Sequence, residues 1–153
     1  MPAEGMVHAL ELVHGLLTPK GFLVDIHPMD EPPPIEITLA RKTCSVGNIQ
    51  EKDDFIEYRQ ADAALAYAIQ NNLFTLERYS NFTFLNHADS LAELHLYLEE
   101  NWSDCIWTDE ITQHAALLYA QEAYKENRAT LRENVHITRL HRLSPNLDES
   151  PSR

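Results

Sequence analysis

Apolar side chains recur at the spacing of a helix in the first part of the chain. The pattern predicts a helix over residues 4–17, with one apolar face formed by Met6, Leu10, Val13 and Leu17. Pro19 and Gly21 follow and end this helix. The next apolar run, Phe22–His27, is short and almost continuous, which is typical of a strand that is covered on both faces.

A proline-rich segment separates this strand from a predicted hairpin. Residues 30–34 (DEPPP) fit neither a helix nor a central strand, because proline lacks the N–H that both require, and they form a stiff spacer. Apolar and polar residues then alternate, with Ile35, Ile37 and Leu39 on one face. Residues 35–49 are therefore predicted to form a hairpin or strand pair.

A second helix is predicted after the hairpin. Asp54 and Glu57 resemble a capping box, with Asp54 as the capping residue, and the helix they open runs to about Asn72. Its inward-facing residues are Ala61, Ala64, Leu65, Ala68 and Ile69.

Two more helices are predicted in the second half of the chain. Ser90 and Glu93 form a capping box that opens a helix running towards Trp102. Thr108 caps the last helix, which runs to about Asn127. Their apolar faces are Leu91, Leu94 and Leu98 in the first and Ile111, Ala115 and Leu118 in the second.

Two strands complete the prediction. Residues 78–88 are aromatic and alternating around Phe82 and Phe84. Residues 134–143 place Val135 and Ile137 inward, and the pattern slips by one residue at Leu140, which indicates a bulge.

Together these elements predict an α/β domain with a mixed sheet of about four or five strands and helices packed on it, with an α+β domain as the alternative. We expect a single domain over residues 1–143, since this length is sufficient to bury a core. Residues 144–153 are polar and contain proline, so we expect a disordered tail.

Charge and composition narrow the range of functions. The chain has 24 Asp and Glu against 12 Lys and Arg, a formal net charge of −12, which repels nucleic-acid phosphates and anionic lipid. No apolar run reaches the roughly 20 residues of a membrane helix, and the first ten residues lack the basic region of a signal peptide. Cys44 and Cys105 lie far apart in sequence and are interpreted as free thiols, so we expect a cytoplasmic protein without nucleic-acid or membrane partners.

The first predicted turn resembles a segment of a known enzyme family. Leu17-Thr18-Pro19-Lys20-Gly21 lies between a helix and an apolar strand, as the L-x-P-G-G turn does before the fifth strand of class I S-adenosylmethionine-dependent methyltransferases, with Lys20 in place of the first glycine. The later order of helix, strand, helices and final strand is also similar to the C-terminal half of that family. The resemblance covers residues 4–143.

The resemblance implies an incomplete methyltransferase. The family binds its cofactor with a glycine-rich loop and an acidic residue that accepts hydrogen bonds from the ribose. Neither can be placed here, since the four glycines are scattered and no strands are predicted ahead of residue 4, so we expect no cofactor. In the family a further strand flanks the one that Phe22–His27 resembles, so we expect this strand to have an open apolar edge.

His27 and Asp25 are the candidates for chemistry. His27 ends the first predicted strand, and ligands of open α/β sheets bind beyond the carboxyl ends of strands. Asp25 lies two residues earlier on the same face, where it could orient the imidazole for acid–base catalysis. The interpretation we favour is that both residues face solvent or pair at an edge, and that no residue of this chain is catalytic.

Other clusters of reactive side chains give weaker indications of a functional site. The eight histidines lack ligand spacing, so we expect no metal site. Acidic residues crowd the junction near residues 99–110, where those at the helix start complement its dipole. No serine or cysteine has a nucleophile-elbow motif or a neighbouring base.

These observations lead to three hypotheses about function. The first is a non-catalytic protein-interaction or oligomerisation module that forms a homodimer. The second is one half of a split methyltransferase, completed by a separate chain with the glycine-rich loop. The third is a small-molecule-binding α+β protein with a pocket near His27.

Overall fold

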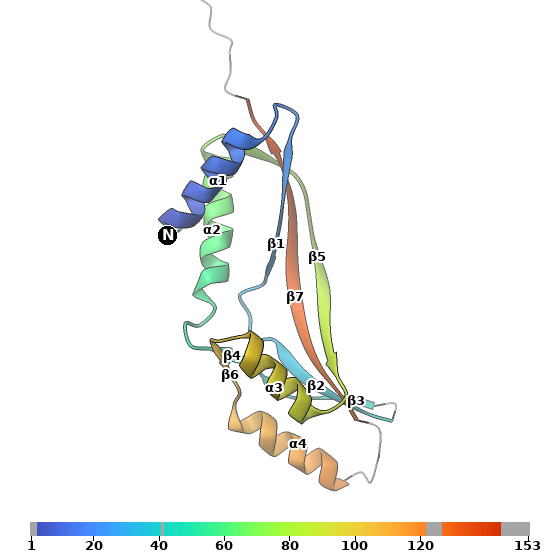
Figure 1. The fold of residues 1–153 in the computed structure, drawn as a ribbon. Coiled ribbons are helices and arrows are strands. Elements are labelled where there is room, and N and C mark those ends of the chain that lie inside the picture. Colours follow the sequence, from blue (N-terminus) through green and yellow to red (C-terminus); the bar gives the residue numbers. More distant parts are fainter. Residues whose placement is uncertain (1–2, 41, 122–126, 145–153) are drawn as a thin grey trace, which may run out of the picture. The chain divides into compact units, whose positions relative to one another are not determined.

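The computed structural model describes residues 3–40, 42–121 and 127–144 (Figure 1). Its elements are α1 (Glu4–Leu16), β1 (Phe22–Pro28), β2 (Pro34–Leu39), β3 (Lys42–Asn48), β4 (Gln50–Glu51), α2 (Ile56–Gln70), β5 (Phe74–Ala88), α3 (Leu91–Asn101), β6 (Cys105–Ile106), α4 (Asp109–Gln121) and β7 (Asn127–Arg142).

Among the described residues, five strands form one sheet with the order β1-β7-β2-β3, and β5 also pairs with β7; β4 and β6 form a separate pair. The predicted sheet of about four or five strands with helices packed on it is confirmed, and its mostly antiparallel pairing places the fold in the α+β class, the predicted alternative to α/β.

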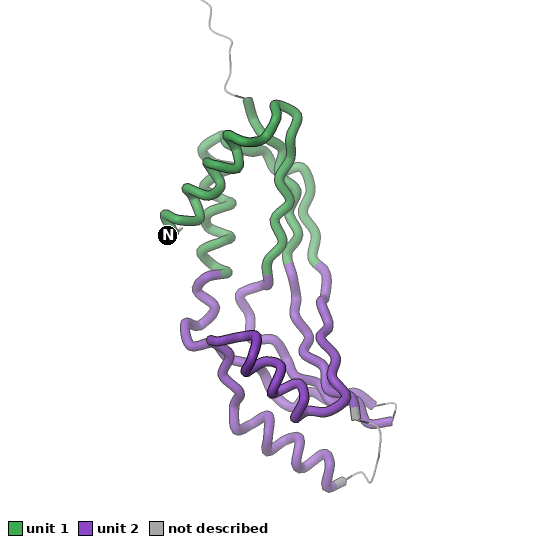
Figure 2. Tube along the Cα trace, in the orientation of Figure 1, with its two compact units in different colours: residues 1–27, 58–81, 136–153 green, residues 28–57, 82–135 purple. Residues whose placement is uncertain are grey.

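The chain divides into two compact units, which are described separately below (Figure 2). Unit 1 contains residues 1–27, 58–81 and 136–153, and unit 2 contains residues 28–57 and 82–135. Strands β5 and β7 contribute residues to both units.

Unit 2 is built on the predicted hairpin. Strand β2 pairs antiparallel with β3, with a shift of register between Ile35 and Glu36, and on its other side β2 pairs with residues 127–131 of β7. The inward residues of these strands meet α3 and α4 in a cluster formed by Ile35, Ile37, Leu39, Val46, Ile49, Leu94, Leu98, Ile111, Ala115, Ala129 and Leu131. A Cβ atom on Gly47 would lie 2.8 Å from Ile111, so glycine at this position lets α4 approach β3 closely.

The helices of unit 2 differ in how they begin. Ser90 is the N-cap of α3, as predicted, and its hydroxyl accepts a hydrogen bond of 3.1 Å from the backbone N–H of Glu93. The predicted cap of α4 by Thr108 is wrong, because the hydroxyl of this residue is buried without a hydrogen-bond partner. Residues 122–126, through which α4 was predicted to continue, lie outside the described residues, and β7 begins at Asn127.

Unit 1 places α1 and α2 on the same side of the strands (Figure 1). Its apolar cluster contains the buried residues Leu65, Ala68, Phe74 and Leu140, with Leu10, Leu17 and Leu23 packed against it. The predicted apolar face of α1 thus points to the core, yet no described residue of α1 is fully buried. The helix is only partly covered within unit 1.

Helix α2 begins two residues after the predicted cap. Asp54 and Phe55 both have positive φ, 56° and 58°, so Asp54 lacks the extended conformation of an N-cap residue and the predicted capping box is wrong. Phe55 is buried, and a turn that inserts this ring into the core takes precedence over the local capping signal.

Two strand predictions also need correction. The expectation that Phe22–His27 is covered on both faces is wrong, because β1 alternates between exposed and covered residues. In β7 the inward residues of unit 1 are His136, Thr138 and Leu140, and both Val135 and His136 are buried. Residues 134–142 of β7 keep one register with β1, so the predicted slip at Leu140 is wrong, and Val135 and His136 are buried on opposite faces of the strand. Apolar pattern alone does not reveal that a histidine and a threonine face inward.

Candidate functional site

Strand β1 brings the two predicted candidate residues together on its inner face. The Nδ1 atom of His27 lies 2.6 Å from the Oδ2 atom of Asp25. The Nε2 atom of the same imidazole lies 3.2 Å from the Oδ1 atom of Asp62, which belongs to α2. His27 is 9% exposed, so the ring is held between two carboxylates in a largely buried position.

This geometry favours the protonated form of His27. A carboxylate only accepts hydrogen bonds, so both ring nitrogens donate together only when the imidazole is protonated. The hydrogen bond to Asp25 raises the pKa of His27 above its ordinary value, and Asp62 acts in the same direction while burial opposes both. With His27 protonated, the three side chains form a partly buried ionic bridge between β1 and α2, with a net charge of about −1.

The same geometry argues against acid–base catalysis by His27. A general base needs a free ring nitrogen within reach of a substrate proton. Here one nitrogen faces Asp25 and the other faces Asp62. The prediction that no residue is catalytic remains a prediction. The favoured view was that His27 and Asp25 face solvent or pair at an edge, and a solvent-facing position does not describe His27, which is largely buried.

Asp62 was missed by the sequence interpretation. It lies 35 residues after His27, in a helix whose predicted inward-facing residues include its neighbours Ala61 and Ala64. No local spacing connects Asp62 to β1, because only the packing of α2 onto the strand brings them together.

A second polar cluster lies next to His27. The ring centroids of His27 and His136 are 5.5 Å apart. The Nδ1 atom of His136 lies 2.6 Å from the hydroxyl of Tyr79 and 2.8 Å from the Oδ1 atom of Asn81, both on β5. The inner face of unit 1 therefore has a polar centre that runs across three strands, β1, β7 and β5.

Asp25 also lines a cavity of about 240 Å³ between α1 and α2, whose other lining residues are apolar or alanine. The third predicted function, a pocket near His27, concerns this cavity.

A larger hollow lies in unit 2, with a volume of about 480 Å³. It is lined by Cys105, Glu99, His95 and Trp107, and the rings of the last two stack with centroids 4.2 Å apart. Burial raises the pKa of the Cys105 thiol to about 11, and Glu51 and Glu99 reinforce the shift. This thiol stays protonated near neutral pH and is a poor nucleophile; Cys44 and Cys105 are both free, as predicted.

The edge of β1 that faces away from β7 has no strand beside it among the described residues, because β1 stands at the end of the sheet order (Figure 1). The carbonyl of Gly21 accepts from Arg142, and the N–H of Met29 donates to Asn134. Both bonds belong to one antiparallel register, in which the backbone N–H and C=O groups of the odd-numbered residues of β1 point towards β7. The N–H and C=O groups of Phe22, Val24 and Ile26 therefore point to the open edge.

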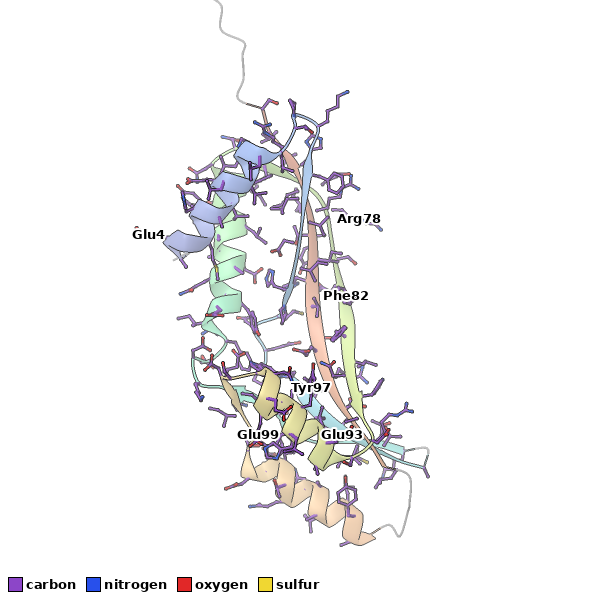
Figure 3. All side chains as sticks on the ribbon, viewed as in Figure 1. Glu4, Arg78, Phe82, Glu93, Tyr97 and Glu99 are labelled. Carbon is purple, nitrogen blue, oxygen red and sulfur yellow. The ribbon has the colours of Figure 1, made fainter. Side chains whose placement is uncertain are left out.

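The side chains of these three residues also form the exposed outer face of β1. The side chains of Phe22, Val24 and Ile26 are 48%, 42% and 57% exposed. The guanidinium carbon of Arg139 lies 4.0 Å from the centroid of the Phe22 ring, and Arg78 on β5 points away from the helices (Figure 3). In the sheet order, β2 pairs with β7 and β3 and is not a neighbour of β1.

Within the described part of the chain, no three His, Cys, Asp or Glu side chains are arranged to hold a metal ion. No helix of the described residues is both long and apolar enough to cross a membrane.

Comparisons with known proteins found no matching family model, no similar curated protein and no similar solved structure. The resemblance to the C-terminal half of a class I methyltransferase thus remains a prediction from the sequence.

Proposed function

We propose that this protein is a non-catalytic interaction module that forms a homodimer through the open edge of β1. The observation that carries the proposal is that this edge presents unpaired backbone groups together with three exposed apolar side chains, at Phe22, Val24 and Ile26. An uncovered apolar edge is a template for pairing with another strand, and soluble proteins cover or block such edges.

The composition of β1 favours a second copy as the occupant. If two copies pair antiparallel about a two-fold axis centred on Val24, Val24 faces its own copy and Phe22 faces Ile26. All three side chains are apolar, so this register avoids the repulsion between like charges that the overall charge of −12 imposes elsewhere.

Pro28 and α1 are compatible with such a pair. Pro28 is even-numbered, so its missing N–H falls on the open edge, where proline is tolerated and pairing ends. Pairing at the edge would extend both the strand layer and the helix layer of unit 1 across two copies. Leu12 and Leu16 of α1, which lie four residues apart, are 57% and 86% exposed. Burial of these residues would bring the interface towards the roughly 1,000 Å² of stable complexes.

The resemblance to methyltransferases gives the second candidate. The helix α1, the turn Leu17–Gly21 and the strand β1 follow the order that the resemblance implies. In the family another strand flanks this position, so a separate chain with the missing strands could occupy the same edge and complete a split enzyme.

Sedimentation velocity at micromolar concentration tests the proposal. The expected result for the wild-type protein is a species of twice 17.6 kDa. The variant Val24→Pro removes an N–H that points to the open edge and leaves the bonds to β7, so it is expected to be monomeric. Val24→Lys serves the same purpose if the proline variant fails to fold, because charge on an edge strand blocks pairing.

The matched control is Leu96→Lys on α3, which places the same charge on an exposed apolar position of unit 2 and should remain dimeric. A wild-type protein that sediments only as a 17.6 kDa monomer would contradict the homodimer. A monomer that forms a stoichiometric complex with a methyltransferase-type chain, lost in Val24→Pro, would favour the split enzyme.

A further inference from the structure

The cavity of unit 1 combines apolar walls with a single charged group. It lies between α1 and α2 above β1, and it holds about 240 Å³. Small residues on both helices leave this space open: Ala9 on α1, and Ala61 and Ala64 on α2. Leu10, Val13 and Leu65 add apolar surface. At roughly 30 Å³ for each water molecule in the liquid, the volume fits a ligand with on the order of eight heavy atoms.

Asp25 is the one charged residue in the lining. Its Oδ2 atom accepts the hydrogen bond from His27, while no described residue donates a hydrogen bond to Oδ1. His27 in turn is held by Asp62, so Asp25 is fixed in place by a chain of two interactions. A pre-positioned carboxylate with a free acceptor atom is a specific polar anchor in an otherwise apolar pocket.

The charge of the cluster selects the ligand. With His27 protonated, the two carboxylates leave a net negative charge of about one unit beside the cavity. An anion would be repelled, and neither ring nitrogen of His27 is available to bind one, because both face carboxylates. An ammonium group at Oδ1 would instead complete the charge balance and make a charge-assisted hydrogen bond.

We propose that unit 1 binds a small amphipathic cation, with its ammonium group on Asp25 and its alkyl part between α1 and α2. The site lies on the inner face of β1, while the proposed dimer contact uses its outer face and open edge. The two proposals therefore stand independently, and Val24→Lys is expected to leave ligand binding unchanged.

Titration with hexylammonium, followed by NMR shifts of alanine and leucine methyl groups, tests the site on the whole protein. We expect the methyl groups of Ala9, Ala61 and Leu65 to shift and to give a dissociation constant on the order of 1 mM, as suits a ligand of seven heavy atoms. Hexanol has the same chain without the charge and should bind at least about tenfold more weakly. Hexanoate should show no saturable shifts.

Three variants separate the charge from the cavity. Asp25→Asn should weaken hexylammonium at least about tenfold while changing hexanol less than about threefold. Ala61→Leu should abolish binding of both, because it fills the space. Asp62→Asn is the matched control, since it removes the other carboxylate on His27 without lining the cavity, and it should change hexylammonium binding less than about threefold.

Absence of saturable shifts with hexylammonium in the wild-type protein would overturn the proposal. Equal binding of hexanoate and hexylammonium, or an unchanged affinity in Asp25→Asn, would also overturn it. A circular-dichroism melt of each variant shows whether it is folded, and the Ala61→Leu result decides the matter if Asp25→Asn does not fold.

Discussion

The inward-facing residues of strand β7 are apolar in unit 2 and mostly polar in unit 1, and this contrast distinguishes the two units. In unit 2 its inward residues Ala129 and Leu131 join an apolar cluster with both strands of the hairpin and with α3 and α4. In unit 1 its inward residues include His136 and Thr138, and polar contacts to β1 and β5 lie where apolar packing would be expected. Both units contain a buried apolar cluster, but that of unit 1 is smaller and lies beside a cluster of hydrogen-bonded polar side chains.

This difference affects what each unit can do. Apolar packing is non-directional and strengthens with the area buried, so the core of unit 2 is suited to stability. A buried hydrogen-bonded cluster holds its members in defined positions, because leaving any of them without its partner is costly. Unit 1 also leaves α1 partly covered and the edge of β1 open. Both proposed sites lie in this less complete unit.

The largest effect is expected from breaking the apolar core of unit 2. Ile37 is 0% exposed in the centre of β2, and Ile37→Ala leaves a cavity among residues that cannot all move to fill it. We expect a loss of about 2–5 kcal/mol in the free energy of unfolding, measured by urea denaturation. Leu96→Ala on the exposed face of α3 should change it by less than about 0.5 kcal/mol.

A smaller effect is expected from breaking the ionic bridge of unit 1. Asp25→Asn removes the carboxylate that accepts the 2.6 Å hydrogen bond from a protonated imidazole. We expect a loss of about 1.5–3 kcal/mol near pH 6, by the same urea measurement. Asp62 is half exposed and its contact is longer, so Asp62→Asn should lose less than about 1 kcal/mol. Equal effects of the two variants would contradict this order.

The ionic bridge also predicts how stability depends on pH. Because the hydrogen bond to Asp25 raises the pKa of His27 in the folded protein, the bridge contributes fully below the unfolded pKa near 6.5 and is lost as the pH rises through the folded pKa. The free energy of unfolding should therefore fall as the pH rises above the ordinary histidine pKa of about 6.5. Most of this fall should be absent in Asp25→Asn, and a wild-type stability that rises with pH over this range would refute the assignment.

The smallest effect is expected at a helix end of unit 2. Ser90→Ala removes the hydroxyl that accepts from the N–H of Glu93, and we expect a loss of about 1 kcal/mol in the free energy of unfolding. Ser103→Ala, at an exposed serine outside any helix, should change it by less than about 0.5 kcal/mol. A loss at Ser90 comparable with that of Ile37→Ala would show that α3 depends on its cap more than on the core.

The sequence by itself determined the elements whose signals are local. The apolar spacing of α1, the alternation at Ile35, Ile37 and Leu39, and the serine cap of α3 are properties of neighbouring residues, and the structure has each of them. The sequence also placed Asp25 and His27 on one face of a strand, because side chains two residues apart in a strand point the same way.

Only the tertiary structure decided what lies beside those elements. Asp62 reaches His27 because α2 packs onto β1, and β1 has an open edge because β7 lies on one side of it and the hairpin pairs elsewhere. Asp54 is not the cap of α2 for the same kind of reason, since the turn that buries Phe55 gives Asp54 a positive φ. Contacts between residues far apart in sequence are set by the packing of whole elements, and a single sequence without that packing contains no local signal for them.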